Sequence, residues 1–209
     1  MSIDQLLTTL SHLWMFVSCS YQKYLYEIIL VFISIAVHIL DARQHILGRI
    51  LIFPNLLLNV HVYSIKRLYG KVFYSVVSVL LNVYAYFQWK GAKTRPPVQV
   101  SRTTEKMLFC IMAVGLFGAL GWSFLMSKCA NIPLSTICLD AIYSSFGFVE
   151  KWLMSRKKLE RWILAFFRYV TFSIACYNAG SVVLMLQHIV LAIIAIYGQV
   201  KWYRSYKKC

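Results

Sequence analysis

The sequence predicts an all-α integral membrane protein with seven transmembrane helices. Composition is the first reason, because 60% of the 209 residues are hydrophobic and only 14% are charged, whereas soluble domains carry about 25% charged residues. The apolar residues also form runs close to the roughly 20 residues that cross a bilayer as a helix. The third reason is an internal repeat in the sequence.

The repeat relates residues 27–89 to residues 140–202 without a gap, at an offset of 113 positions. Matching positions include Glu27 and Asp140, Arg43 and Arg156, Phe53 and Phe166, Tyr84 and Tyr197, and Trp89 and Trp202. Apolar residues coincide easily by chance, but acidic, arginine and tryptophan positions do so less often. The repeat therefore predicts two copies of one membrane-spanning unit, as in many secondary transporters.

Seven apolar runs, separated by short charged or turn-forming stretches, define the expected helices. They cover residues 24–40, 46–65, 70–89, 107–126, 135–153, 162–178 and 182–202. In the N-terminal segment 1–23, residues 5–19 are apolar but too short for a full span. This segment leaves open an additional N-terminal hydrophobic helix.

The spans group into two bundles of three. The expected order is a three-helix bundle 24–89, a cytoplasmic linker 90–106 with two prolines, a connecting helix 107–126 and a second three-helix bundle 135–202. Three spans end on the side opposite to their start, so one intervening helix makes the two bundles parallel copies. The result is a 3+1+3 arrangement, and the glycines at 115, 118 and 121 permit close packing of the connecting helix.

Basic residues predict the orientation in the membrane. Five lie in the linker 90–106, five lie in residues 150–161, and others lie in the basic tail 203–209. Because cytoplasmic loops carry the excess of lysine and arginine, the C-terminus is expected in the cytoplasm. Lys66, Arg67 and Lys71 are then on the opposite side, in conflict with this rule. The net charge of +15 belongs to these loops, and no basic face indicates a nucleic-acid partner.

Ionisable residues inside the apolar runs are functional candidates, because charge is costly within a bilayer. Glu27 and Asp140 occupy equivalent repeat positions near the starts of the first and fifth spans. They fit either a pair of coupling carboxylates or structural acids that cap a helix or tie the repeats together. The residues alone leave both interpretations open.

No metal or cofactor site is expected, and no enzyme. His38, Asp41 and His45 share a helical face, but they lie where a span ends and a fourth ligand is not evident. A membrane enzyme would need clustered histidines or carboxylates at one depth, and the sequence shows no such cluster and no catalytic motif.

Neutral polar side chains on the spans suit an uncharged or aromatic solute. Asn55 follows Pro54, which frees a backbone carbonyl inside the second span. Ser75 and Asn82 belong to a polar and aromatic stripe along the third span. The last span places Gln187 and His188 at positions equivalent to Tyr74 and Ser75, and the sixth adds Trp162 and Tyr169.

The second half of the chain resembles a known family of membrane proteins. The stretch EKWLMSRKKLERWILAFFRYV, followed after one span by HIVLAIIAIYGQVKW, resembles the closing signature of the PnuC-type nicotinamide riboside transporters. The first half is similar through Glu27, Asn55, Leu68-Tyr69, Asn82, Tyr84 and Trp89. The resemblance covers roughly residues 24–202.

This resemblance implies a SWEET-like 3+1+3 fold, assembly as a homotrimer and a multi-pass location in the cell inner membrane. It implies facilitated diffusion of nicotinamide riboside or a related vitamin or nucleoside, with the site between the two bundles. Stacking on the ring is then expected from Tyr84, Trp162 and Tyr169, and hydrogen bonding from Asn55, Ser75, Asn82, Gln187 and His188.

The chain departs from the family pattern where the solute binds. Arg161 stands where the family often has Asn, Ala165 where a second Trp is common, Tyr169 where Asn or Asp is expected, and Ser75 where Gln is usual. These departures leave the identity of the solute open. Two other hypotheses stand beside the main one: a proton-coupled carrier of thiamine or riboflavin, and a membrane scaffold that transports nothing.

Overall fold

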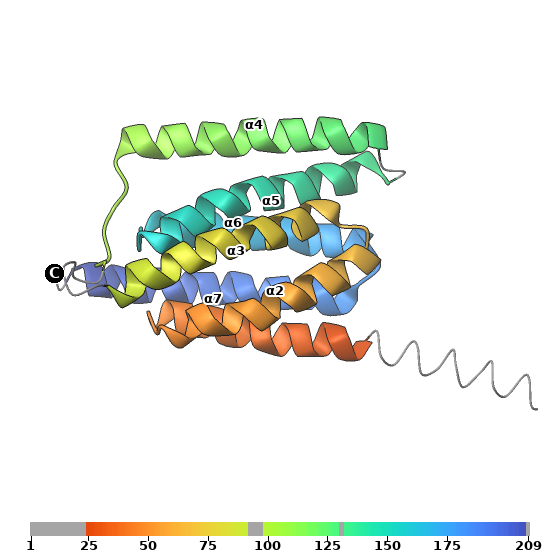
Figure 1. Ribbon diagram of the computed structural model, residues 1–209. Helices are drawn as coiled ribbons and strands as arrows, with labels where there is room; N and C mark the ends of the chain where they lie inside the picture. The colour runs from red at the N-terminus through yellow and green to blue at the C-terminus, as the bar shows by residue number, and fades with distance from the viewer. Residues whose placement is uncertain (1–23, 92–97, 130–131, 208–209) are drawn as a thin grey trace, which may run out of the picture.

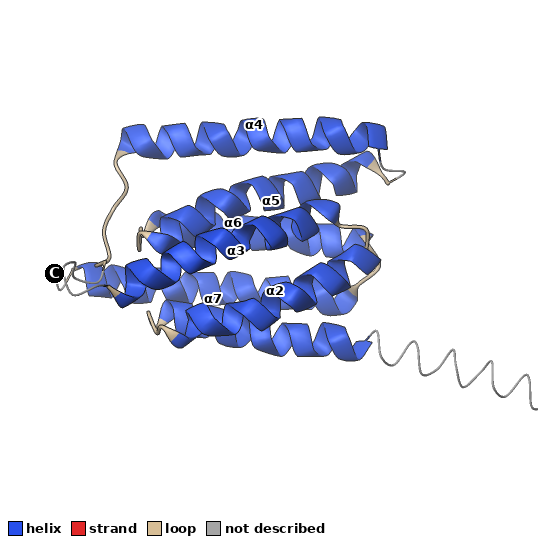
Figure 2. Cartoon of the chain, viewed as in Figure 1, coloured by secondary structure: helices blue, strands red, loops and turns tan. Residues whose placement is uncertain are grey.

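The protein is a bundle of roughly antiparallel helices (Figure 1). The computed structural model describes residues 24–91, 98–129 and 132–207, and in these ranges the chain forms seven helices and no strand (Figure 2). The helices are Tyr24–Ala42, α2 Leu47–Ile65, α3 Tyr69–Lys90, α4 Glu105–Cys129, α5 Leu134–Ser155, α6 Glu160–Asn178 and α7 Val182–Tyr206. The all-α prediction is confirmed. The additional helix considered for residues 5–19 lies outside the described residues.

Four of these helices are long and apolar enough to cross a membrane: Tyr24–Ala42, α3, α4 and α7. The other three are less apolar because they carry polar side chains that point into the bundle. Asn55 of α2, Glu150 of α5 and Arg168 of α6 are all buried. Their polarity therefore belongs to the interior of the bundle, and the outer faces of the same helices carry apolar side chains such as Leu57, Ile142 and Phe167.

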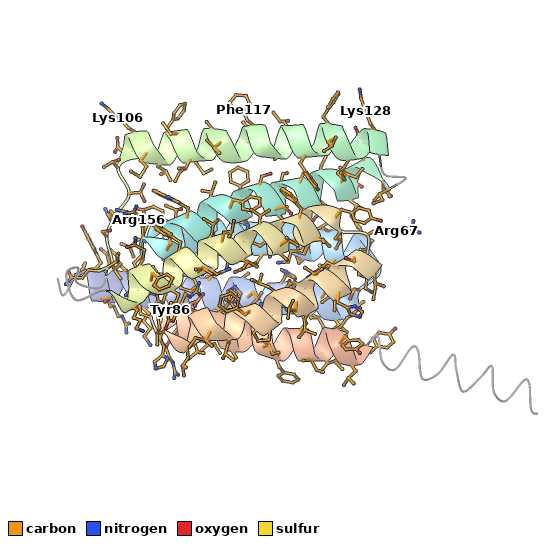
Figure 3. The ribbon with its side chains drawn as sticks, viewed as in Figure 1. Arg67, Tyr86, Lys106, Phe117, Lys128 and Arg156 are labelled. Carbon is orange, nitrogen blue, oxygen red and sulfur yellow. The ribbon has the colours of Figure 1, made fainter. Side chains whose placement is uncertain are left out.

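Helix α4 lies along one edge of the bundle, beside α5 (Figure 1). Gly115 allows the close contact, because a Cβ atom there would lie 2.6 Å from the ring of Phe146. On the opposite side of α4, Phe117 points away from the bundle, and Lys106 and Lys128 lie at the two ends of the helix (Figure 3). The apolar stretch between the two lysines matches the thickness of a bilayer.

The turns between helices repeat at the offset found in the sequence. Gln44 and Lys157, 113 positions apart, both adopt a positive φ, of 57° and 49°. After each of them, a backbone N–H donates to a carbonyl five residues earlier: His45 to Leu40 and Lys158 to Leu153, both at 2.9 Å. This 6→1 hydrogen bond after a left-handed residue is the Schellman ending of a helix.

The next turn of each half repeats in the same way. Arg67 and Gly180 have positive φ values of 56° and 73°, and the following N–H groups of Leu68 and Ser181 donate to Tyr63 and Cys176, both at 3.0 Å. Matched turns at two places mean that the helices before and after them end and begin at equivalent positions.

Part of the linker is held against the turn between α5 and α6. The backbone N–H of Ser101 donates to the carbonyl of Lys157 at 3.2 Å, and Leu159 returns a bond to Ser101 at 3.0 Å. The side chain of Glu160, in the first turn of α6, accepts from the backbone N–H and the hydroxyl of Thr103. The linker therefore fixes the start of α6, a helix that carries several residues of the candidate site.

Candidate functional site

A group of buried rings lies at the centre of the bundle. The aromatic cluster consists of Tyr63, Tyr74, Tyr143, Tyr169, Phe172 and His188, and each of these residues is at most 4% exposed. The ring of Tyr143 stacks on Phe172 with centroids 3.9 Å apart, and His188 meets Phe172 edge-on at 4.8 Å. Because α2, α3, α5, α6 and α7 all contribute, the cluster joins both halves of the chain.

Lys71, near the start of α3, extends its ammonium group into this cluster. The nitrogen donates to the hydroxyl of Tyr143 at 2.7 Å and lies 4.5 Å from the centre of the same ring. Its distances to the ring centres of Tyr63, Tyr74 and Phe172 are 5.4, 5.2 and 5.9 Å. Four aromatic rings therefore surround the buried side-chain nitrogen of Lys71.

Two histidines, His188 within the aromatic cluster and His38 beside it, each form a hydrogen bond through Nδ1 to a carbonyl of their own helix. His38 Nδ1 lies 2.7 Å from the carbonyl of Ser34, and His188 Nδ1 lies 2.8 Å from that of Leu184. A carbonyl only accepts, so the proton is on Nδ1 in each case. Nε2 of neutral His38 is then the acceptor for the Tyr169 hydroxyl at 2.5 Å, a contact between the first helix and α6.

Buried charges gather beside the aromatic cluster. The charged cluster consists of Asp41, Arg49, Glu150, Lys151, Arg161 and Arg168, all at most 7% exposed. Asp41 forms an ion pair with Arg49, and Glu150 forms one with Arg168. Arg168 connects the two clusters, since its Nε donates to the Tyr143 carbonyl at 2.8 Å and its guanidinium lies 4.2 Å from that ring.

Arg161, the second residue of α6, lies between the two carboxylates. Its nitrogens are 3.7 Å from Asp41 and 3.3 Å from Glu150, and the side chain is fully buried. The guanidinium lies over the ring of Trp162, 3.8 Å from the ring centre. That ring in turn requires Gly198, where a Cβ atom would lie 2.6 Å from it.

Glu27 and Asp140 lie at the far end of the bundle from the charged cluster, and each contacts the opposite half of the chain. Glu27 accepts a hydrogen bond at 2.8 Å from the hydroxyl of Ser181, the N-cap of α7, and pairs with Lys66 at 3.0 Å. Asp140 accepts from the backbone N–H groups of Gly70 and Lys71 at the start of α3, at 2.6 and 2.9 Å. A carboxylate at a helix N-terminus is stabilised by the helix dipole.

The structure brings together some of the residues predicted for binding. Tyr169 and His188 both belong to the aromatic cluster, with ring centres 6.1 Å apart. Trp162 lies under Arg161, and Asn82 accepts hydrogen bonds from Arg49 and Lys151 at 3.2 and 3.5 Å. These residues line the clusters from α3, α6 and α7.

Other predicted residues lie elsewhere or bond to their own surroundings. Tyr84 is half-buried beside Arg156, away from the clusters. Asn55 accepts from Ser34 at 2.8 Å, between α2 and the first helix. Ser75 donates to the carbonyl of Lys71 on its own helix at 2.8 Å. The side chain of Gln187 is buried, and its oxygen has no hydrogen-bond partner within the described residues.

The sequence analysis does not identify Lys71, Glu150 or Lys151 as residues of the site. Lys71 follows Lys66 and Arg67 closely and so resembles a loop residue, and Glu150 and Lys151 fall within a basic connection. The signal available for Lys71 is its spacing of three residues from Tyr74, which puts both on one face of α3.

Within the described residues, no three His, Cys, Asp or Glu side chains come together as metal ligands would.

A bundle of apolar helices around a buried polar and aromatic interior is compatible with a membrane transport protein. A model of the family described as "Nicotinamide mononucleotide transporter" matches residues 24–204. The chain therefore belongs to this family of transmembrane transporters, which confirms the family resemblance and the expectation that the protein is not an enzyme.

The fold agrees with this assignment. The chain is similar to a solved structure described as "Crystal structure of the Vitamin B3 transporter PnuC", with a TM-score of 0.74 and 15% sequence identity. The similarity covers 100% of this chain and 94% of that one. Among the curated proteins, none matches this chain.

Proposed function

We propose that the protein is a facilitator that passes nicotinamide riboside, or a related vitamin or nucleoside, across the inner membrane. The aromatic cluster carries this proposal, because it puts stacking rings and hydrogen-bonding groups of both halves around one buried position. Rings of this kind bind flat heterocycles, and polar side chains beside them bind sugar hydroxyls. Membership of the nicotinamide mononucleotide transporter family and the similarity to a vitamin B3 transporter support this class of solute.

The contacts at both ends of the bundle support movement of one half against the other. Glu27–Ser181 and Asp140–Gly70 tie the halves at one end, and Asp41–Arg161 and Lys151–Asn82 tie them at the other. Alternating access requires that one set opens while the other stays closed.

Finer features of the proposal come from the sequence. The matched turns and the peripheral position of α4 support the 3+1+3 arrangement. Three basic residues, Lys66, Arg67 and Lys71, conflict with a cytoplasmic C-terminus. Lys66 pairs with Glu27 and Lys71 is buried, so neither counts as a free loop charge, and only Arg67 still conflicts. We also propose that the protein is a homotrimer in the inner membrane. Light scattering of the purified protein in detergent measures the number of subunits, and three are expected.

Facilitated diffusion is favoured over proton coupling by the contacts of Glu27 and Asp140. Each acid is held by backbone or side-chain donors at a helix N-terminus of the other half, which is a structural role. A proton-coupled carrier would use at least one of them as a titrating group, and its uptake would depend on a pH gradient.

Uptake into proteoliposomes tests the proposal. Radiolabelled nicotinamide riboside, thiamine and riboflavin are each offered with and without a pH gradient. We expect at least one to equilibrate and to exchange with unlabelled solute, independently of the gradient. If none enters or exchanges, and none shifts the thermal unfolding of the protein, a non-transporting scaffold is the better description.

A further inference from the structure

A recess lies on the outer face of the bundle, where the end of the first helix meets the last turns of α7, at the left of Figure 1. It has a volume of about 510 Å³ and is lined by Gln44, Tyr197, Val200, Lys201, Arg204 and Ser205. The side-chain amide of Gln44 donates to the hydroxyl of Ser205 at 3.3 Å, which joins the two sides of the recess. None of the lining residues belongs to the aromatic cluster or the charged cluster, so the recess is separate from the candidate site.

Three basic side chains surround this recess. Lys201 donates to the hydroxyl of Tyr197 at 3.2 Å, and the side chain of Arg43 lies close to the same hydroxyl. Arg204 follows about one turn after Lys201 on α7 and also lines the recess. Arg43 and Arg204 are exposed, and arginine does not lose its proton in proteins. The recess therefore carries fixed positive charge on both of its sides.

No acidic side chain of the described residues balances these charges. The acids in this part of the chain are Glu27, Asp41, Glu105, Asp140, Glu150 and Glu160. Four of them are buried in the bundle, Glu160 bonds to Thr103, and Glu105 begins α4. Within the described residues, no ion pair involves a basic residue of the recess. A negative group that enters the recess therefore meets positive charge that these acids do not offset.

The position of the recess on α7 corresponds to the depth of the lipid headgroups. Two exposed tyrosines, Tyr203 and Tyr206, lie near the end of this helix, and amphipathic aromatic side chains of this kind prefer the membrane interface. Towards the middle of the bilayer, the same face of α7 exposes Ile193, Ile196 and Val200. An apolar face that ends in a basic recess matches the layout of a phospholipid, whose acyl chains end in a phosphate.

The internal repeat provides a comparison site within the same chain. Tyr84 and Arg156 occupy the positions of Tyr197 and Arg43 at the offset of 113 residues. The guanidinium of Arg156 lies 5.7 Å from the centre of the Tyr84 ring. An arginine beside a tyrosine is therefore common to both repeats and belongs to their shared architecture.

The two basic residues of α7 have no counterpart in the other repeat. Gln88 stands at the position of Lys201, and Gly91 stands at that of Arg204. Helix α3 ends before Gly91, whereas α7 continues past Arg204. Since the first repeat packs without these cations, the fold does not require them. Their position together at one recess points to a ligand.

We propose that this recess binds the phosphate of an anionic phospholipid, whose acyl chains lie along the exposed face of α7. Basic side chains just outside the apolar part of a helix attract anionic lipids, and each contributes roughly fivefold to the affinity. In the orientation proposed above, the lipid belongs to the cytoplasmic leaflet. The inference goes beyond the proposed transport function and does not depend on it, because the lipid binds on the outer face and the solute inside the bundle.

Native mass spectrometry of the purified full-length protein in a neutral detergent tests the proposal. Dioleoylphosphatidylglycerol and dioleoylphosphatidylcholine are compared, because they have the same acyl chains and differ in the charge of the headgroup. We expect phosphatidylglycerol to bind with a Kd about tenfold or more below that of phosphatidylcholine. Equal binding of the two lipids overturns the inference.

A soluble headgroup distinguishes a lipid from a free phosphate as the ligand. Glycerol 1-phosphate has the same phosphate but no acyl chains, so it should not displace phosphatidylglycerol when both are present at the same concentration. If it does displace the lipid, the recess is a site for free phosphates and the proposal of a lipid is wrong.

Charge-removing variants locate the lipid. Lys201→Gln and Arg204→Gln change side chains on the outer surface of α7, so both variants should fold and melt close to the unchanged protein. Each should raise the Kd for phosphatidylglycerol about fivefold, and the double variant about twentyfold or more. The Kd for phosphatidylcholine should not change.

Arg156→Gln, at the matching place of the other repeat, is the control and should leave both affinities unchanged. An unchanged affinity in the double variant, or an equal loss in the control, overturns the assignment. The measured mass also reports the number of copies. If the double variant separates the subunits and keeps its affinity for the lipid, the recess is a contact between copies and the inference fails.

Discussion

Trp89 and Trp202, which occupy equivalent positions of the two repeats, each donate an indole hydrogen bond to the opposite half of the chain. Trp89 Nε1 donates to the carbonyl of Met154 at 3.1 Å, and Trp202 Nε1 donates to that of Asp41 at 3.2 Å. Their two acceptors are themselves 113 positions apart. The reciprocal pair is therefore a symmetric tie between the end of the third helix of one half and the end of the first helix of the other.

Replacing either tryptophan by phenylalanine removes this tie while keeping most of the ring. We expect Trp89→Phe and Trp202→Phe to destabilise the protein by about 1–3 kcal/mol each, because a buried carbonyl loses its partner and the smaller ring leaves space. The symmetry predicts losses of similar size. Thermal unfolding in detergent measures them, with Trp152→Phe, a half-buried tryptophan beside α4, as the matched control. A large loss in only one variant contradicts the symmetric role.

The acids at the other end of the bundle should act as structural ties. Asp140→Asn removes a carboxylate that accepts two backbone N–H groups at the start of α3, and an amide can accept only with its oxygen. We expect a loss of about 1–3 kcal/mol, which lowers the melting temperature by several degrees, and no change in the response of uptake to a pH gradient.

Glu105→Gln, an exposed acid at the start of α4, is the control for Asp140→Asn, and Glu27→Gln is its repeat counterpart. Suppose instead that uptake depends on a pH gradient and that Asp140→Asn or Glu27→Gln abolishes this dependence without changing stability. The acids would then be coupling groups, and the structural interpretation would be wrong.

The number and type of the helices could be predicted from the sequence because both follow from local apolar runs. The ends of the helices were harder to predict from the sequence. The predicted connecting helix 107–126 is Glu105–Cys129 in the structure, and the last span continues to Tyr206. Charged residues such as Lys128 and Arg204 continue a helix beyond its apolar part, since they extend into the polar interface.

Most residues of the two clusters could not be predicted from the sequence, and the reason is a different one. A charge in an apolar chain indicates a loop unless it lies deep in a run, but buried charges become tolerable through partners far away in sequence. Lys66 is neutralised by Glu27, and Arg161 lies between Asp41 and Glu150. Such pairs depend on how the helices pack, and one sequence without relatives does not contain that information.

Close packing around Trp162 should make Gly198 intolerant of any side chain. A Cβ atom there would lie 2.6 Å from three atoms of the Trp162 ring, so Gly198→Ala must displace the ring that lies under Arg161. We expect a destabilisation of about 1–3 kcal/mol and a change in tryptophan fluorescence. Gly121→Ala is the control, because nothing lies within 4 Å of its Cβ position, and alanine should stabilise α4 by about 0.5–1 kcal/mol. Equal effects of the two substitutions would mean that α7 shifts freely.

Tyr169 and Tyr84 give the sharpest test of the site, because the sequence suggested stacking for both and the structure separates them. Tyr169 is 2% exposed within the aromatic cluster, and its hydroxyl bonds His38 at 2.5 Å. Tyr84 lies beside Arg156, with the guanidinium 5.7 Å from its ring centre. The two residues thus have similar chemistry in different surroundings.

We expect Tyr169→Ala to reduce uptake at least tenfold and Tyr84→Ala to leave it within about twofold of the unchanged protein. Tyr169→Phe separates the ring from the hydroxyl. If the ring stacks on the solute, this variant retains most of the uptake and loses mainly the bond to His38, a contribution of about 1 kcal/mol to stability. His38→Ala combined with Tyr169→Phe should then be no less stable than His38→Ala alone, because the two groups form one interaction. If Tyr84→Ala abolishes uptake while Tyr169→Ala does not, the solute passes outside the aromatic cluster and the site is wrongly placed.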